Sequence, residues 1–182
     1  MCEHKNMSNS AKKSAKNSNG HAWRIIGIDP GYDRMGIAVI EKVSGKKDAV
    51  IYSDCLQTSA KEDIYQRFLR IGVKVGEVIK KFEPDALSIE NLFIANNKKT
   101  AMRVSEVRGI IIYEAVKRAV PVHEYTPMEI KLSVTGDGSS DKVRIIKMVS
   151  LLVELPSKKR VDDEYDAIAV ALTHSAHMHY PQ

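Results

Sequence analysis

The sequence predicts an α/β fold in which a mixed sheet of five strands is flanked by helices. Three observations lead to this prediction. Five short segments have the apolar composition and the flanking turn residues expected of strands. A long segment with apolar residues at helical spacing separates the first three of them from the fourth. The order of three strands, a helix, a strand and further helices, without an internal repeat, is typical of α/β proteins.

The chain has the size and composition of one folded domain. Its 182 residues, 43% hydrophobic and 28% charged, suit one well-packed core and are too few for two ordinary domains. No apolar run approaches the roughly 20 residues that span a bilayer, and the N-terminus lacks the apolar core of a signal peptide. We therefore expect a cytoplasmic protein without membrane contact, with Cys2 and Cys55 as free thiols.

The positive charge lies largely outside the predicted domain. Residues 1–22 hold four lysines against one glutamate, which is +3, so only +2 of the net charge of +5 remains for the rest. This segment is rich in Ser, Asn and Lys, and we expect a disordered basic tail. The domain is expected over residues 23–178, with a short tail at 179–182. Net charge alone is therefore weak support for nucleic-acid binding.

The first three strands are expected to be antiparallel neighbours. Residues 24–29 (RIIGID) form a short apolar run that ends in an acid, and residues 35–41 (MGIAVIE) follow after a turn at Pro30 and Gly31. This pair predicts a β-hairpin. Residues 49–53 (AVIYS) are expected to add a third strand.

A long amphipathic helix follows. Its apolar side chains recur at spacings of three and four, and they are Ile64, Phe68, Ile71, Val75, Val78 and Phe82. We expect this apolar face to pack on the sheet, and Pro84 to end the helix. Residues 86–90 (ALSIE) then predict a strand that again ends in an acid.

The second half of the chain is predicted to be mostly helical. Residues 100–119 predict a helix and residues 120–125 (VPVHEY) a strand. Thr126 precedes a proline and stands three residues before Glu129, which is an N-cap signature for a short helix that carries Lys131.

Two closing helices complete the chain. A glycine-rich loop at residues 135–140 (TGDGSS) precedes a helix at 141–154, and a last helix is expected at 162–177. Pro156 and a basic turn separate these two helices.

Acidic residues stand where strands end or a helix begins. Asp29 and Glu90 each follow a buried strand, and Asp162, Asp163 and Asp166 open the last helix. Ligands of α/β sheets usually bind at strand ends, and carboxylates three or four residues apart share one face of a helix. Such carboxylates suit Mg²⁺, and two ions about 3.5–4 Å apart are a known arrangement for cutting phosphodiesters.

Each acid also has an ordinary structural explanation. Asp29 before Pro-Gly is a common turn former, Glu90 can be a surface strand end, and acids at a helix start are favoured by the macrodipole. The coincidence of all of them favours a functional site. Helical geometry leaves open whether Asp162 or Asp163 accompanies Asp166.

Four segments, IIGIDPGYDRMGIAVIE, ALSIENLF, EYTPMEIKLSVTGDGSSDK and DDEYDAIAVALTH, resemble the successive signature segments of the RuvC family over roughly residues 24–174. This resemblance implies a ribonuclease H-like fold, a homodimer, and symmetric paired nicks in a four-way DNA junction (Holliday junction). It also implies two Mg²⁺ ions in each active site, which Mn²⁺ can replace, and the branch-migration proteins RuvA and RuvB as partners. The matching positions for the catalytic, metal-binding acids are Asp29, Glu90, Asp163 and Asp166, so the resemblance decides for Asp163 over Asp162.

The resemblance extends to residues that would meet DNA. Lys131 and Lys142 match the two lysines beside the metal site and would bind the scissile phosphate or offset charge in the transition state. Phe93 matches an aromatic residue that stacks on an unpaired base. Three further cations after the fourth strand are expected to line the junction arms: Lys98, Lys99 and Arg103. Without the resemblance, all of these are ordinary surface or core residues, and we assign no catalytic role to His123 or His174.

Three other functions agree with part of the sequence. GIDPG after a strand also resembles the phosphate loop of actin-like ATPases, but such proteins need two lobes and a second phosphate motif. An RNA-processing nuclease related to the YqgF group keeps the fold with another substrate, and Phe93 with Lys131 and Lys142 favours the junction instead. A nucleic-acid-binding module without activity is disfavoured because all four acids are present.

Overall fold

The computed structural model describes residues 22–91 and 98–178. Five strands and five helices are assigned in this part of the chain. In chain order they are β1 (Trp23–Asp29), β2 (Arg34–Lys42), β3 (Ala49–Gln57), α1 (Ile64–Phe82), β4 (Ala86–Glu90), α2 (Lys98–Val116), β5 (Val122–Tyr125), α3 (Pro127–Thr135), α4 (Lys142–Leu152) and α5 (Asp162–His177). The mixed α/β fold predicted from the sequence is thereby confirmed.

The five strands form one sheet in the order β3-β2-β1-β4-β5. β1 pairs with β2 and β2 with β3 in antiparallel fashion, whereas β1 pairs with β4 and β4 with β5 in parallel. The parallel pairs require crossovers through α1 and α2, which is the usual role of helices between parallel strands. β1 therefore lies at the centre of the sheet.

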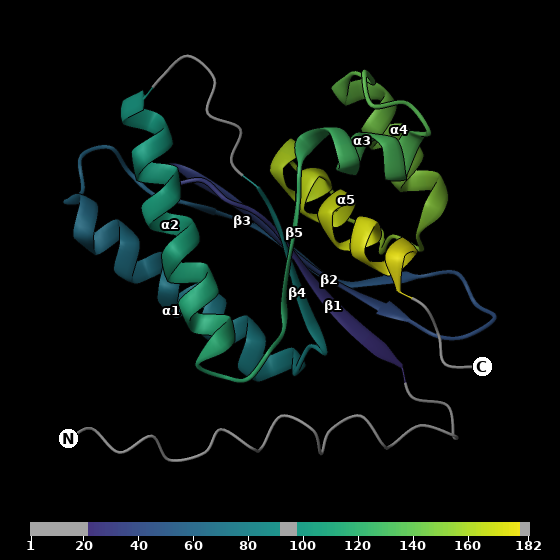
Figure 1. The fold of residues 1–182 in the computed structure, drawn as a ribbon, viewed down its shortest axis with the longest axis horizontal. Helices are drawn as coiled ribbons and strands as arrows, with labels where there is room; N and C mark the ends of the chain where they lie inside the picture. Colours follow the sequence, from purple (N-terminus) through teal and green to yellow (C-terminus); the bar gives the residue numbers. More distant parts are fainter. Residues whose placement is uncertain (1–21, 92–97, 179–182) are drawn as a thin grey trace, which may run out of the picture.

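Helices cover both faces of the sheet (Figure 1). One face packs on α1 and α2 through a cluster that includes Ile26, Ile28 and Ile71. The other face packs on α3, α4 and α5 through a second cluster, which includes Ile25 and Ile168. Ile25 belongs to one cluster and Ile26 and Ile28 to the other, because successive side chains of a strand point to opposite faces.

Helix α5 lies unusually close to the sheet because two glycines face it. A Cβ atom on Gly27 would come 2.2 Å from the backbone oxygen of Ala167, and one on Gly36 would come 2.0 Å from the backbone oxygen of Asp163. No other residue type fits at that separation. These glycines therefore determine how near the sheet the first turns of α5 can lie.

Most predicted elements occur with small changes at their ends. α1, β4 and α5 have the predicted bounds, while β3 continues to Gln57, four residues beyond the prediction. α2 begins at Lys98 and ends at Val116, and β5 begins at Val122. The capping box predicted at Thr126 and Glu129 is present at the start of α3.

Some predictions concern residues outside the described ranges. These are the basic tail, apart from residue 22, the last four residues, and Phe93. Among the helices of the described residues, none is long and apolar enough to cross a membrane.

Candidate active site

Parallel pairing brings the first two predicted acids together. Ile28 of β1 lies opposite Ile89 of β4, so the next residues, Asp29 and Glu90, end adjacent strands at the same edge of the sheet. Both side chains project to the face covered by α5, because Ile28 and Ile89 project to the other face. The register of two strands therefore places two carboxylates side by side.

The third acid comes from α5. Asp166 directly precedes Ala167, whose backbone lies against Gly27 of β1. Together with Asp29 and Glu90 it lines a cavity of about 280 Å³. The full set of lining residues is Asp29, Glu90, Pro127, Ile130, Lys131, Ser140, Asp141, Lys142, Ile145, Asp166 and Ala169. Three predicted acids and both predicted lysines thus meet in one cavity.

Burial and mutual repulsion disfavour the charged forms of these carboxyl groups. The pKa of Asp29 is raised to about 7, first by burial and then by the charges of Glu90, Asp166 and Asp163. The pKa values of Glu90 and Asp166 are also raised, with burial as the largest cause in both. A bound cation would relieve this repulsion.

The two lysines supply positive charge to the cavity from α3 and α4. The ammonium of Lys142 lies 3.1 Å from a carboxylate oxygen of Asp166 and 3.5 Å from one of Asp162. Burial alone would lower the pKa of Lys142, but these ion pairs hold it above the usual value. The charge of Lys131 lowers the pKa of Glu90, which places this lysine within electrostatic reach of the acids.

The fourth predicted acid faces an adjoining depression. Both Nε and Nη2 of Arg34 donate hydrogen bonds to Oδ2 of Asp163, the Nε bond at 2.9 Å. Burial alone would raise the pKa of Asp163, but the Arg34 hydrogen bonds hold it below its usual value. Among the described residues, no three His, Cys, Asp or Glu side chains form a ready group for a metal ion as they stand.

Asp162 and Asp163 differ in their relation to the cavity. The charge of Asp163 contributes to the raised pKa of Asp29. The side chain of Asp162 is 61% exposed and lies beside Lys142. Asp163, the residue that the resemblance selects, is therefore within electrostatic reach of Asp29.

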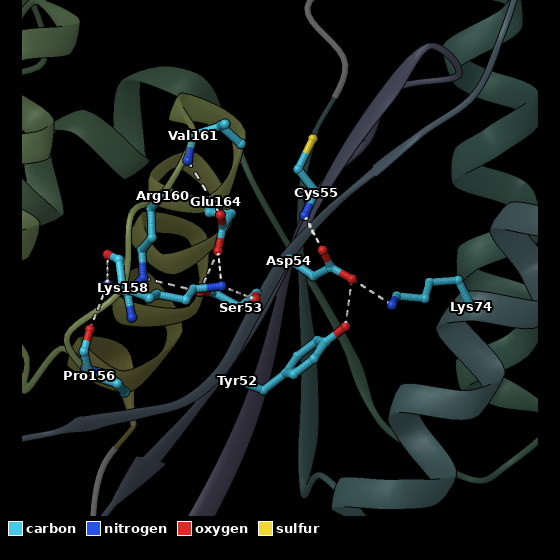
Figure 2. A network of polar contacts seen from close by, with 10 residues as sticks. All are labelled: Tyr52, Ser53, Asp54, Cys55, Lys74, Pro156, Lys158, Arg160, Val161 and Glu164. Atoms are coloured by element: carbon cyan, nitrogen blue, oxygen red, sulfur yellow. Dashed lines mark hydrogen bonds and ion pairs between the residues drawn. The ribbon is translucent and has the colours of Figure 1, made fainter.

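A buried carboxylate anchors the start of α5 (Figure 2). Glu164 accepts a 2.6 Å hydrogen bond from Ser53 of β3 and forms a 2.6 Å ion pair with Lys158. Its other oxygen accepts from the backbone N–H of Val161, 3.3 Å away. Arg160 of the same connection donates to Ser53 Oγ at 3.1 Å and to the Pro156 carbonyl at 2.9 Å. The basic turn before α5 is thus held against β3.

Three other predicted DNA-binding residues belong to the first turns of α2. Lys98 and Lys99 open α2, and Arg103, one turn later, forms an ion pair with Glu106. Arg103 does not line the cavity. His123 and His174, to which we assigned no catalytic role, stack on each other with ring centroids 4.1 Å apart, and Nδ1 of His174 lies 2.8 Å from the Tyr125 hydroxyl.

Three charged residues near the site were not singled out in the sequence. They are Arg34, Arg108 and Glu164. Arg108 of α2 is buried, donates to the backbone oxygen of Glu90 and pairs with Glu124. The sequence could have indicated Arg108, because it follows the apolar Val107 and a buried arginine needs polar partners. Arg34 gives no comparable signal, since it is an exposed residue at the start of β2.

The sequence matches one protein family along most of its length. The model of the family "Crossover junction endodeoxyribonuclease RuvC" matches residues 25–174. The protein of that name from Moorella thermoacetica is 40% identical over 152 residues, which cover 84% of this chain and 90% of the relative. The one from Thermosipho melanesiensis is 42% identical over 148 residues, covering 81% and 94%.

Solved structures agree with this match. The structure titled "T. thermophilus RuvC in complex with Holliday junction substrate" superposes with a TM-score of 0.79 at 30% identity, covering 85% of this chain and 94% of that one. The yeast mitochondrial Holliday junction resolvase Ydc2 has a TM-score of 0.64 at 16% identity, covering 85% of this chain and 78% of that one, which supports the fold alone. The ribonuclease H-like fold is therefore confirmed. With the family model and the relatives in agreement, this chain belongs to the RuvC family of crossover junction endodeoxyribonucleases.

Proposed function

We propose that this chain is a metal-dependent endonuclease that resolves four-way DNA junctions by paired symmetric nicks. One observation carries the proposal: Asp29, Glu90 and Asp166, from β1, β4 and α5, line one cavity with Lys131 and Lys142. Membership of the RuvC family indicates the substrate. Asp163 is the fourth acid of the proposed site.

The donor set suits divalent cations. Mg²⁺ and Mn²⁺ prefer oxygen ligands, few of them from protein. The cavity offers carboxylates whose pKa values are raised by burial first and by neighbouring negative charges second. We propose that Asp29, Glu90, Asp163 and Asp166 hold two Mg²⁺ ions, with Mn²⁺ as a substitute. When bound, such ions activate water and stabilise the leaving oxygen of a phosphodiester.

The lysines would contact the DNA backbone. Lys142 already lies 3.1 Å from Asp166, so a phosphate that approaches the acids comes within its reach. Lys131 lines the same cavity from α3. Both would offset the negative charge that grows in the transition state. Lys98, Lys99 and Arg103 are proposed to contact the junction arms, and Phe93 to stack on an unpaired base.

Cleavage of a labelled synthetic four-way junction tests this function. The parent should make symmetric paired nicks only when Mg²⁺ is present, and should leave linear duplex and RNA–DNA hybrid intact. Asp29→Asn should lose cleavage, by a factor of at least about 100, and still bind the junction. Glu77→Gln, an exposed change on α1, is the matched control and should cut like the parent. Cutting by Asp29→Asn at the parental rate would refute the site.

The same assay separates the YqgF-like alternative. Neither of the relatives described above carries that name. Cleavage of RNA substrates with an intact DNA junction would keep the fold and change the function.

We also propose a homodimer. Three apolar side chains of α1 recur every fourth residue on one helix face and are exposed: Tyr65 is 70%, Leu69 60% and Val73 51% accessible. Large apolar residues are exposed on the neighbouring α2 as well, namely Met102, Tyr113 and Val116. A two-fold dimer suits a substrate with two equivalent strands. RuvA and RuvB as partners, and a cytoplasmic location, are further proposals from the sequence.

A further inference from the structure

A basic depression adjoins the proposed active site. It has a volume of about 480 Å³ and shares Lys142 with the cavity. Its lining residues are Arg34, Lys142, Arg160, Val161, Asp162 and Asp163. Three of these side chains are cationic and two are carboxylates, which leaves one net positive charge. Once a carboxylate is withdrawn the depression suits an anion, and a neighbouring phosphate of a bound DNA strand is the anion at hand.

Two of these cations, Arg34 and Arg160, come from different parts of the fold. Arg34 begins β2 and keeps 47% of its side chain exposed. Arg160 is oriented from the α4–α5 connection by its hydrogen bonds to Ser53 and Pro156 (Figure 2). The planar guanidinium of arginine matches the geometry of a phosphate, which it binds through two parallel hydrogen bonds.

In the structure the guanidinium of Arg34 is hydrogen-bonded to the carboxylate of Asp163. Both of its hydrogen bonds end on the same oxygen, Oδ2, and the Asp163 side chain is only 19% exposed. The same carboxylate is the one acid of the proposed four that does not line the cavity. A cation bound in the cavity would therefore compete with the guanidinium for Asp163.

We propose that Arg34 is a second phosphate-binding residue, which Asp163 masks until a divalent cation draws that carboxylate into the cavity. Cation binding would thereby release Arg34 toward the DNA backbone. The two events are coupled, so each would strengthen the other. This inference rests on the proposed nuclease function and deepens it.

The first test measures Mn²⁺ binding to the metal-free protein without DNA, by electron paramagnetic resonance. Arg34→Ala should bind Mn²⁺ about three- to tenfold more tightly than the parent, because its competing ion pair is gone. Arg70→Ala removes a comparable exposed arginine, paired with Glu62 on the α1 side, and should bind Mn²⁺ like the parent.

A double-mutant cycle separates competition from simple loss of charge. In an Asp163→Asn background, Arg34→Ala should change Mn²⁺ affinity by less than about twofold, since no carboxylate remains to compete for. An equal gain in both backgrounds would indicate a long-range charge effect and overturn the masking. Circular dichroism of each variant verifies that it is folded.

The second test measures junction binding over a salt series with EDTA or with Ca²⁺, with junction integrity checked on a denaturing gel. One additional phosphate contact should steepen the slope of log affinity against log salt by about 0.9 for the parent when Ca²⁺ is present. Arg34→Ala should lack this increment, and Arg70→Ala should keep it. An increment retained by Arg34→Ala would overturn the phosphate contact.

The outcomes distinguish this inference from the function on which it rests. A protein that cuts junctions while Arg34→Ala binds Mn²⁺ like the parent refutes the inference alone. A protein that does not cut junctions refutes the proposed function. The Mn²⁺ measurements involve no DNA, so their result does not depend on that outcome.

Discussion

Asp29 occupies a position that costs stability. It ends a buried strand beside Glu90, and burial and three neighbouring carboxylates raise its pKa to about 7. The unfolded chain has the usual value near 3.8. Between these two pH values the folded protein holds more protons than the unfolded one, so stability is lost as the pH rises through about 7. Function, and not folding, explains a carboxylate at this place.

Asp29→Asn should therefore stabilise the metal-free protein. At pH 8 we expect a gain of about 1–3 kcal/mol in the free energy of unfolding, with a smaller gain at pH 5. Urea unfolding in EDTA at both pH values measures this, with Glu77→Gln as the control. Equal or lower stability of Asp29→Asn at pH 8 would contradict the electrostatic picture.

His174 should make the protein sensitive to acid. Burial lowers its pKa to about 4, with further contributions from His123, His177 and Lys42. The unfolded chain takes up a proton near pH 6.5, which the folded protein resists, so stability is complete above about 6.5 and is lost as the pH falls toward 4.

The contribution of His174 should be on the order of 1–3 kcal/mol. In His174→Gln, the free energy of unfolding should fall less steeply between pH 6.5 and 4.5 than in the parent, as measured by urea titration at several pH values. Identical slopes in the two proteins would show that His174 does not titrate in this way.

At the scale of elements, the site depends on how closely α5 approaches the sheet. Gly27 and Gly36 allow the helix backbone to touch β1 and β2, and Glu164 attaches its first turn to β3. Asp163 and Asp166 lie on this same turn and the next, so the approach of the helix sets their positions. Packing of one helix is therefore linked directly to the geometry of the acids.

Gly36→Ala tests this link. Its Cβ would meet the Asp163 carbonyl at 2.0 Å, so α5 must shift, at a cost of about 1–3 kcal/mol. Junction cleavage should fall together with stability. The matched control is Gly109→Ala on α2, where a Cβ meets nothing within 4 Å, and which should gain roughly 0.5–1 kcal/mol. Thermal unfolding and the cleavage assay measure both variants, and full activity in Gly36→Ala would contradict the argument.

At the scale of the whole molecule, the two faces of the sheet have different tasks. Helices α3, α4 and α5 build the cavity on one face, while α1 and α2 cover the other (Figure 1). The exposed apolar side chains of α1 and α2 are on the side of the molecule opposite the cavity. Dimerisation through these helices would leave both cavities open to DNA.

Leu69→Glu should separate the proposed dimer. Burying a glutamate in an apolar interface is costly, so the sedimentation coefficient should fall to that of a monomer at micromolar concentrations. Leu151→Glu on α4 is the matched control, because Leu151 has the same 60% exposure on the other side of the molecule. A parent that sediments as a monomer would refute the dimer, and an unchanged dimer in Leu69→Glu would refute this interface.

Element type and order could be predicted from the sequence because they depend on local patterns. The spacing of apolar residues in α1 and the capping box at Thr126 are signals within one turn or a few turns of chain. Strand ends were predicted less well, since β3 continues through Asp54 and Cys55, beyond its apolar run. The hydrogen bonds of its neighbour β2 extend this strand, and no local pattern reports them.

The identity of the candidate acids also follows from the sequence, through strand ends, helix spacing and resemblance. The ion pairs that these acids form in the folded protein do not follow from the sequence. Arg34 pairs with Asp163 across 129 residues, and Lys142 reaches Asp166 from another helix. Such contacts depend on how close α5 packs to the sheet, which is a property of the assembled core. The sequence therefore determined which carboxylates belong to the site, and folding decided which cations they meet, because ion pairs form between whatever side chains the tertiary packing brings within reach.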